Sequence, residues 1–142
     1  MAAVKAKNTK PELMVRRALH ARGFRYTLHR KDLPGKPDIV LPKYKAVIFV
    51  NGCFWHGHDC SAFSWPRTRA DFWRNKIEGN IARDLRNEAL LSESRWRVAT
   101  VWECSLKGKT KRGISSVADE IETWLLSVLS EFDSEAPAKR VL

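Results

Sequence analysis

Residues 38–60 read DIVLPKYKAVIFVNGCFWHGHDC. The stretch opens with two short runs rich in β-branched side chains, 38–41 and 46–50, which a proline-containing segment joins. Short apolar runs bounded by turn residues favour two neighbouring strands. The second run leads into ten residues that include two cysteines, two histidines and a Phe-Trp pair. The sequence therefore predicts a strand hairpin followed by a loop dense in metal-binding side chains.

A helix and a strand are expected before this hairpin. Thr9 and Glu12 have the spacing of a capping box, with a proline early in the first turn, and Gly23 is a typical helix stop. Residues 24–28 alternate apolar and polar side chains, as a half-buried strand does. The patterns therefore predict a helix that begins after Thr9 and a strand that leads into the hairpin.

Two helices and another strand are expected after the loop, which spans residues 51–67. A loop of this length inside a compact domain is usually functional. Thr68 and Asp71 are typical of a helix start, and one face of that helix carries an apolar residue at every fourth position: Trp73, Ile77, Ile81 and Leu85. The expected elements are a helix over 69–94, a strand over 96–102, a helix over 116–132 and a flexible tail over 133–142.

The resulting order, α-β-β-β-α-β-α, indicates a single α/β domain over residues 1–132, with a mixed β-sheet flanked by helices. The chain contains no run of about 18 apolar residues, and its basic N-terminal segment lacks the apolar stretch of a secretory signal. The composition therefore favours a cytoplasmic protein with no membrane partner.

The net charge of +10 is concentrated in one part of the chain. Residues 1–50 contain 12 Lys and Arg against 3 Asp and Glu, whereas residues 51–142 contain 14 against 13. A basic excess in one part of a domain indicates a polyanionic partner such as nucleic acid. A basic surface that serves only solubility is the alternative.

The cysteines favour a metal site over a disulfide framework. Their number, three, is odd, and cysteine beside histidine in a reducing compartment indicates metal binding. Cys53, His58 and Cys60 lie within eight residues, and Cys104 follows the last expected strand. A set of three thiolates and one imidazole suits a closed, tetrahedral zinc site. Small buried thiols beside a surface histidine are the alternative, because the spacing matches no standard zinc finger.

Asp38, at the start of the first run, is a candidate catalytic carboxylate. Mg²⁺ takes one or two protein carboxylates and keeps several waters, and such a cation can polarise a phosphate and position a water. His56, which the zinc set leaves free, could accept the proton of that water. Glu12 and Asp84 are further acidic candidates. Each acid also has an ordinary structural explanation, namely a turn for Asp38, the helix cap for Glu12 and a solvated ion pair for Asp84.

Three segments, residues 33–60, 66–87 and 96–104, together resemble the very short patch repair (Vsr) endonucleases, over about Asn8 to Trp124. The resemblance implies a restriction-endonuclease-like fold of the PD-(D/E)XK type. It implies an Mg²⁺-dependent enzyme that nicks one DNA strand 5′ to the thymine of a T:G mismatch, which deamination of 5-methylcytosine produces. It also implies a bacterial, nucleoid-associated protein with mismatch-repair proteins as partners.

The resemblance assigns catalytic roles to individual residues. Asp38 and the backbone carbonyl of Val50 match the Mg²⁺ contacts, and His56 matches the catalytic histidine. The positions around the site are matched by Glu12, Asn51 and Asp84. Asn51 stands where some members have a histidine that bonds a metal-bound water, and an amide can still make that bond but cannot titrate.

The resemblance also implies the structural zinc ligands Cys53, His58, Cys60 and Cys104. It makes Phe54, Trp55 and Trp73 the aromatic side chains that push between base pairs beside the mismatch. For Trp73, core packing on its helix stripe is the alternative. Phosphate contacts are expected at three basic residues in the same region: Arg67, Arg69 and Lys76.

Two other functions fit the same residues. One is a nuclease of the same fold that acts on another mismatch or on intact duplex, and the other is a catalytically weak, zinc-stabilised DNA-binding module. Asn51 and the late start of the chain are compatible with the second, because members commonly carry a further N-terminal segment that touches DNA. Either such a segment is missing from this sequence or the grip on DNA is weaker. A monomer is expected, because a mismatch lacks two-fold symmetry.

Overall fold

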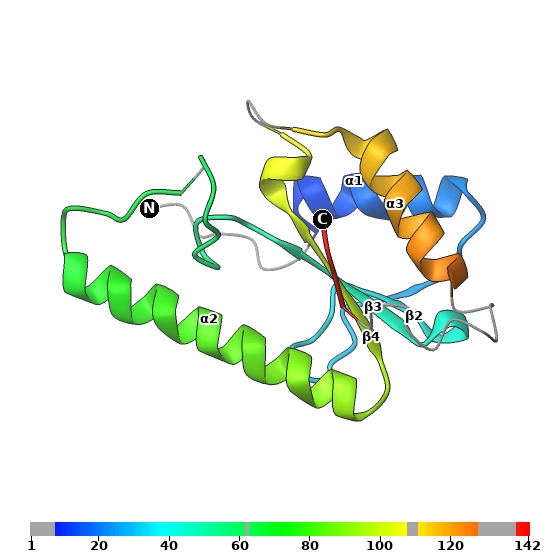
Figure 1. Cartoon of the computed structure of the whole chain (residues 1–142), viewed down its shortest axis with the longest axis horizontal. Coiled ribbons are helices and arrows are strands. Elements are labelled where there is room, and N and C mark those ends of the chain that lie inside the picture. The colour runs from blue at the N-terminus through cyan, green and yellow to red at the C-terminus, as the bar shows by residue number, and fades with distance from the viewer. Residues whose placement is uncertain (1–7, 62, 108–110, 128–138) are drawn as a thin grey trace.

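A computed structural model describes residues 8–61, 63–107, 111–127 and 139–142. A five-stranded sheet lies at the centre, with α1 (Lys10–Ala21) and α3 (Ile114–Leu126) over one face and α2 (Ala70–Glu93) across the other (Figure 1). Within these described ranges, no helix is long and apolar enough to cross a membrane. The architecture confirms the predicted α/β class with a mixed sheet flanked by helices.

The sheet has its strands in chain order: β1 (Thr27–Leu28), β2 (Ile39–Leu41), β3 (Ala46–Asn51), β4 (Arg97–Trp102) and β5 (Lys139–Val141). The first three strands are antiparallel, and β3, β4 and β5 run parallel. The predicted hairpin is confirmed as β2 and β3, joined by a 3₁₀ turn over Pro42–Tyr44. Parallel pairing of β3 with β4 requires a long crossover between them, and the loop and α2 supply it.

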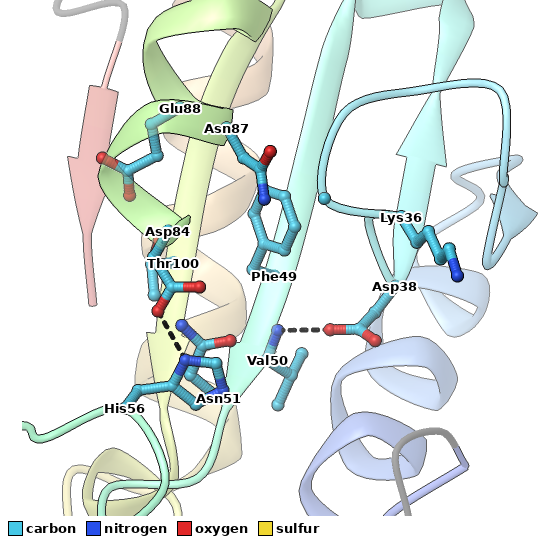
Figure 2. Close-up of a pocket in the computed structure, with 11 residues that line it drawn as sticks. Lys36, Asp38, Phe49, Val50, Asn51, His56, Asp84, Asn87, Glu88 and Thr100 are labelled. Carbon is cyan, nitrogen blue, oxygen red and sulfur yellow. Dashed lines mark hydrogen bonds and ion pairs between the residues drawn. The ribbon is translucent and has the colours of Figure 1, made fainter. Parts of the chain in front are cut away.

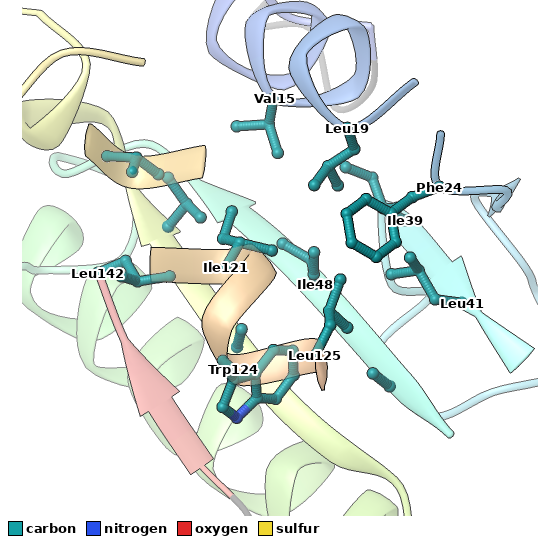
Figure 3. Close-up of a cluster of buried hydrophobic side chains, with 14 of the residues drawn as sticks. Val15, Leu19, Phe24, Ile39, Leu41, Ile48, Ile121, Trp124, Leu125 and Leu142 are labelled. Carbon is teal, nitrogen blue, oxygen red and sulfur yellow. The ribbon is translucent and has the colours of Figure 1, made fainter. Parts of the chain in front are cut away.

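The core lies on both faces of β3. Ile48 belongs to the larger cluster, where α1 contributes Leu19 and α3 contributes Ile121 (Figure 3). Its neighbour Val47 belongs to a smaller cluster that includes Leu91 of α2. Successive side chains of a strand point to opposite faces. The run 46–50 is therefore continuously apolar because β3 is covered on both sides.

The start of the first helix agrees with the prediction, and that of the long helix does not. Thr9 caps α1, and its hydroxyl oxygen accepts a hydrogen bond from the Glu12 amide at 3.4 Å. The long helix begins at Ala70 after Arg69, whose backbone is left-handed with φ 54°, and it has no side-chain cap. The expected cap at Thr68 is therefore wrong.

The apolar stripe of α2 is confirmed only in its first part. Ile77 is buried, whereas Leu85 is 58% exposed. The reason is helix geometry, because a repeat of four residues drifts by about 40° per step around a helix of 3.6 residues per turn. Two such steps carry Leu85 away from the face that Ile77 occupies.

Three segments differ from their predicted bounds. Only Thr27–Leu28 of the expected strand 24–28 pairs in the sheet. The last helix begins at Ile114, two residues earlier than expected, and its remaining expected part from residue 128 lies outside the described residues. The flexible tail expected over 133–142 is wrong for 139–141, which form β5, while 133–138 lie outside the described residues. Leu142 helps to hold the end of the chain, because its amide donates to the Thr100 carbonyl at 2.8 Å.

Candidate active site and metal centre

The register between β3 and β4 brings two distant parts of the chain to one edge of the sheet. Asn51 pairs with Trp102 at the carboxyl ends of these parallel strands. Cys53 and Cys104 each lie two residues beyond that pair. The sheet itself therefore delivers the loop after β3 and the end of β4 to the same place.

At this edge the four predicted zinc ligands come together as a group that we call the thiolate cluster: Cys53, His58, Cys60 and Cys104. Their ligand atoms all lie within 4.8 Å of one another, and Nδ1 of His58 is 3.6 Å from Sγ of Cys104. The His58 ring stacks on Trp102, with ring centroids 4.0 Å apart. This convergence favours a metal site over isolated buried thiols.

Burial acts against free thiolates in this cluster. It raises the pKa of Cys53 to about 12 and also raises the pKa of Cys104. Burial lowers the pKa of His58, which favours the neutral imidazole that a metal binds. A bound cation reverses the effect of burial on a thiol, because it stabilises the deprotonated sulfur directly. Three cysteines and one histidine form a donor set of closed zinc sites.

Gly57 lets the loop sit directly on α2. Its φ is 59°, a left-handed conformation, and a Cβ there would lie 2.7 Å from Cδ1 of Ile81 and 2.8 Å from Cγ2 of Ile77. Both the backbone angle and the lack of space require glycine. Asn80, also on α2, donates its side-chain amide to the Trp55 carbonyl at 2.9 Å. The loop is thus held from the helix side as well as from the thiolate cluster.

His56 is oriented by a carboxylate of α2. Its Nδ1 lies 2.5 Å from Oδ2 of Asp84, and a dashed line marks this contact in Figure 2. A carboxylate that accepts from Nδ1–H leaves Nε2 as the basic atom of a neutral imidazole. The arrangement can therefore prepare His56 to accept a proton or to bond a water at Nε2.

Asp38 immediately precedes β2, and its Oδ2 accepts a hydrogen bond from the Val50 amide at 2.8 Å. Burial is the largest of the effects that raise the pKa of Asp38 to about 7, and the nearby Glu12 carboxylate adds to it. The Val50 amide and His29 act in the opposite direction. The Asp38 carboxylate is therefore destabilised in a way that a bound cation would relieve.

Asp38 and His56 line the same cavity, of about 260 Å³. Figure 2 shows His56 and Asp84 on one side of Val50 and Asn51, and Asp38 on the other. A second hollow of about 450 Å³ adjoins the first, since both are lined by Val50, Asn51 and His56. Its wall also includes Glu12, Phe54 and Trp55. The five predicted catalytic residues are thus distributed over two adjoining hollows.

The three aromatic side chains expected to push between base pairs pack on one another. The ring centroid of Phe54 lies 5.3 Å from that of Trp55 and 5.5 Å from that of Trp73. Trp73 is half-buried against these loop rings and belongs to neither core cluster. The alternative of core packing for Trp73 therefore does not describe its surroundings.

Two further rings lie near Phe54, Trp55 and Trp73 and, with them, form what we call the aromatic surface. Trp65 is 39% exposed with the Arg74 guanidinium 4.3 Å from its ring centroid, and Phe72 is 45% exposed with Arg69 at 4.2 Å. The other expected phosphate contacts, Arg67 and Lys76, are exposed in the same region. Alternating rings and guanidinium groups are typical of surfaces that bind nucleic acid.

Comparisons with known proteins show the family of the chain. A family described as DNA mismatch endonuclease Vsr matches residues 1–62. The chain is 57% identical over 106 residues to the type II nicking enzyme V.XorIIP of Xanthomonas oryzae pv. oryzae. The matched region covers 75% of this chain and 78% of that protein. The chain is 49% identical over 109 residues to V.NmeAIP of Neisseria meningitidis, covering 77% and 78%. The chain belongs to the Vsr family. It is also 39% identical over 125 residues to the DNA mismatch endonuclease Vsr of Escherichia coli K12, covering 88% and 80%.

Sequence reasoning missed several residues of this Vsr-family site. Gly57 and Asn80 position the loop, and a glycine between two histidines was the one available signal for the first. Lys36 and Asn87 line the cavity beside Asp38. His29 lies against Glu12 and beside Asp38. The antiparallel pairing of β1 with β2 places it beside Asp38, and no spacing rule in the sequence reveals that pairing.

Proposed function

We propose that this Vsr-family chain is a DNA endonuclease that nicks one strand of a duplex 5′ to the thymine of a T:G mismatch. The observation that carries the proposal is the convergence of Asp38 and His56 on one cavity beside an aromatic surface. The relatives are described as nicking enzymes and as a mismatch endonuclease, and this supports both the reaction and the substrate class.

Asp38 and the Val50 carbonyl would hold a divalent cation, expected from the sequence to be Mg²⁺. The half-buried Asp38 carboxylate fits a cation, because burial disfavours its charged form and a cation offsets that effect. When bound, the cation would stabilise negative charge on the reacting phosphate. His56, fixed through Asp84, would accept a proton from water at Nε2. Asn51 can bond a water or a phosphate oxygen without titrating.

The aromatic surface would recognise the mismatch. Inserting a side chain between base pairs costs a few kcal/mol of unstacking, and the cost is lower where pairing is already defective. Phe54 and Trp55 come from the loop that carries His56, so a ring placed in the duplex sets the distance from the lesion to the site of cleavage. Mismatch selection would then arise from deformability as well as from base contacts.

The thiolate cluster would hold zinc as a structural ion. Four protein ligands would fill its coordination shell and leave no position for substrate. Such an ion would tie the loop to the end of β4 and so keep the rings of Phe54 and Trp55 at a constant distance from His56. The restriction-endonuclease-like class is supported by the β2–β3 hairpin with Asp38 at its start, although Val50, Asn51 and Gly52 replace the usual Glu-x-Lys half of the motif.

A strand-resolved nicking assay tests the proposal. Duplexes labelled on each strand should carry T:G, other mismatches or a correct C:G pair in varied flanking sequence, with either Mg²⁺ or Mn²⁺ present. We expect one nick, 5′ to the mismatched thymine, and none in the opposite strand. Equal cutting of the C:G duplex would overturn the mismatch specificity. Binding of T:G duplex without any nick would leave a DNA-binding module instead of an enzyme.

A further inference from the structure

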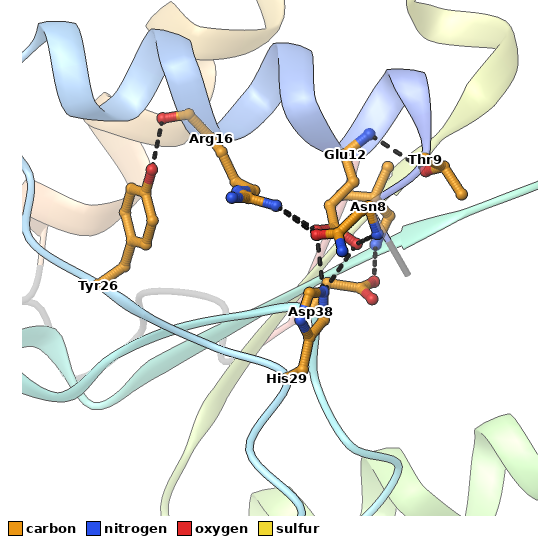
Figure 4. A network of polar contacts seen from close by, with 8 residues as sticks. Asn8, Thr9, Glu12, Arg16, Tyr26, His29 and Asp38 are labelled. Carbon is orange, nitrogen blue, oxygen red and sulfur yellow. Dashed lines mark hydrogen bonds and ion pairs between the residues drawn. The ribbon is translucent and has the colours of Figure 1, made fainter. Parts of the chain in front are cut away.

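A second group of potential ligands lies apart from the thiolate cluster, and we call it the carboxylate cluster: Glu12, His29 and Asp38. Figure 4 shows their side chains meeting between the start of α1 and the sheet. Nε2 of His29 lies 2.9 Å from one oxygen of Glu12 and 3.1 Å from the other. One ligand atom from each of the three residues lies within 4.8 Å of the other two.

The fold builds this cluster from three separate elements. Glu12 lies in the first turn of α1, and its residue is 1% exposed. The pairing of Leu28 with Ile39 places His29 beside Asp38, and the His29 amide donates to the Asp38 carbonyl at 3.1 Å. His29 reaches this position with a left-handed backbone, φ 48°, which is unfavourable for a residue with a Cβ. Strain of this kind is kept when the surrounding structure determines the position.

The spacing of the ligand atoms fits a shared cation. Neighbouring ligands of an octahedral ion with bonds of about 2.1 Å are separated by about 3 Å. The distances from Nε2 of His29 to the Glu12 oxygens have this value. A hydrogen bond between imidazole and carboxylate would explain the same contact, but it would not explain why a second, half-buried carboxylate, that of Asp38, lies beside them.

The charges of the cluster also favour a cation. Arg16 donates to Glu12 at 3.0 Å and balances one negative charge. Two carboxylates that share a buried site repel each other unless a positive group compensates them. A divalent cation would compensate Asp38 and leave a net positive charge for the phosphate of DNA. The cluster also adjoins both hollows, since Asp38 lines the first and Glu12 the second.

We propose that Nε2 of His29 is a direct ligand of the catalytic divalent cation, together with Asp38 and Glu12, and that the site therefore prefers Mn²⁺ to Mg²⁺. The inference rests on the proposed function, because it concerns the cation of the same active site. Mg²⁺ prefers oxygen ligands and keeps most of its waters, whereas imidazole suits transition-metal ions. A set of two carboxylates and one imidazole is thus better matched to Mn²⁺.

Electron spin echo spectroscopy of Mn²⁺ bound to the zinc-loaded protein, without DNA, tests the ligand directly. Mn²⁺ is poorly suited to thiolate sites, so it will report on the carboxylate cluster. We expect ¹⁴N modulation from a coordinated imidazole in the wild type and its loss in His29→Gln. The control His20→Gln alters an exposed histidine of α1 and should keep the modulation. Absence of ¹⁴N modulation in the wild type, or its persistence in His29→Gln, would overturn the proposal.

A second measurement separates ligation from simple positioning. Glutamine offers an oxygen in place of the imidazole nitrogen, so His29→Gln should lower the ratio of nicking rates in Mn²⁺ and Mg²⁺ by about tenfold or more. A variant that loses activity equally with both cations would argue for a positioning role and against ligation. Thermal unfolding and zinc content of the variant should match those of the wild type.

The two proposals fail in different ways. If the wild type nicks T:G duplex and its Mn²⁺ shows no ¹⁴N modulation, the ligand proposal is wrong and the enzyme activity stands. If ¹⁴N modulation is present and no duplex is nicked with either cation, the metal ligand is supported and the proposed function is wrong.

Discussion

The thiolate cluster and the carboxylate cluster are two groups of potential metal ligands built on one sheet. The first gathers four soft donors, three of them from a single loop, and its donor set is already complete. The second gathers two carboxylates and one imidazole from α1, from the residue after β1 and from the residue before β2, beside two hollows. A metal ion with four protein ligands can hold a loop in place. An ion with fewer protein ligands keeps coordination positions for water and phosphate. Under the proposed function, the thiolate cluster would be structural and the carboxylate cluster catalytic.

The largest expected effect comes from removing the negative charge of Asp38 in the carboxylate cluster. Asp38→Asn keeps the shape and can still accept the Val50 amide hydrogen, but it carries no negative charge. We expect the nicking rate on T:G duplex to fall by a factor on the order of 10²–10³, with DNA binding retained. Single-turnover nicking and fluorescence anisotropy measure the two quantities. Near-normal nicking by this variant would remove Asp38 from the chemistry.

Removing a ligand of the thiolate cluster should act through the loop. Cys104→Ser is expected to release zinc and to destabilise the fold by several kcal/mol, because binding of a structural zinc ion contributes to folding. Metal analysis and thermal unfolding check both effects. The variant also tests whether the two clusters are independent. At a temperature where Cys104→Ser is still folded, Mn²⁺ should still bind the carboxylate cluster and show ¹⁴N modulation. Loss of Mn²⁺ binding in a folded Cys104→Ser protein would show that the two clusters are not independent.

The pH dependence of stability depends on Asp38. Its folded-state pKa is about 7 against 3.8 for a free side chain, so the folded protein holds more protons than the unfolded chain between these values. Stability of the wild type should therefore fall as pH rises from about 4 to about 7. Asp38→Asn should be the more stable protein above pH 7, by at most on the order of 4 kcal/mol, and should lose this advantage near pH 4.

Thermal unfolding from pH 4 to pH 8, without added Mg²⁺ or Mn²⁺, measures this effect. The matched control is Asp32→Asn, because the Arg30 guanidinium lowers the pKa of that exposed carboxyl. The control should show no gain at high pH. A wild type whose stability rises steadily over the whole range would contradict a raised pKa at Asp38.

Substitution of Gly57 by alanine tests how strictly α2 fixes the position of the loop. An alanine there would take a left-handed backbone and would meet the side chains of Ile77 and Ile81, at a cost of about 1–3 kcal/mol. We expect Gly57→Ala to reduce nicking while zinc stays bound, because His56 and not the thiolate cluster is displaced. Gly79→Ala is the control, since a Cβ at that helical position meets nothing within 4 Å. Unchanged nicking by Gly57→Ala would show that the loop tolerates a shift.

The smallest expected effect is on DNA affinity. Trp65→Ala removes an exposed ring that Arg74 covers, and stacking of a base on an aromatic ring contributes about 1–3 kcal/mol. We expect weaker binding of T:G duplex with an unchanged nicking rate at saturating enzyme. Leu85→Ala, which truncates an exposed apolar side chain of α2, serves as the control. Equal affinity of both variants would exclude Trp65 from the DNA surface.

How far the sequence could predict the site depends on how each cluster is assembled. Three ligands of the thiolate cluster lie within eight residues, and the fourth follows a recognisable strand, so all four could be named in advance. His29 could not, because its place depends on a pairing of only two residues between β1 and β2. The alternation of 24–28 predicts a longer strand than the one that forms, and it does not indicate which residue lies opposite Asp38.

The fold shows the same division between local and distant information. The hairpin and the start of α1 follow from turns and caps that act over a few residues. The place of β5 depends on hydrogen bonds between Leu142 and strand β4, which no local pattern reveals. The predicted apolar stripe of α2 fails at Leu85, because a small angular difference per step accumulates along a helix of 24 residues.

The pairing of Asn51 with Trp102 has a consequence for how the molecule reaches its final form. Sliding β3 by one residue along β4 would move Cys53 by about 3.3 Å relative to Cys104 and turn alternate side chains to the wrong face. A tetrahedral ion tolerates no such displacement among its ligands. Zinc would therefore bind tightly only to chains whose strands are correctly aligned. It would selectively stabilise the correct register of the sheet during folding, before the protein binds DNA.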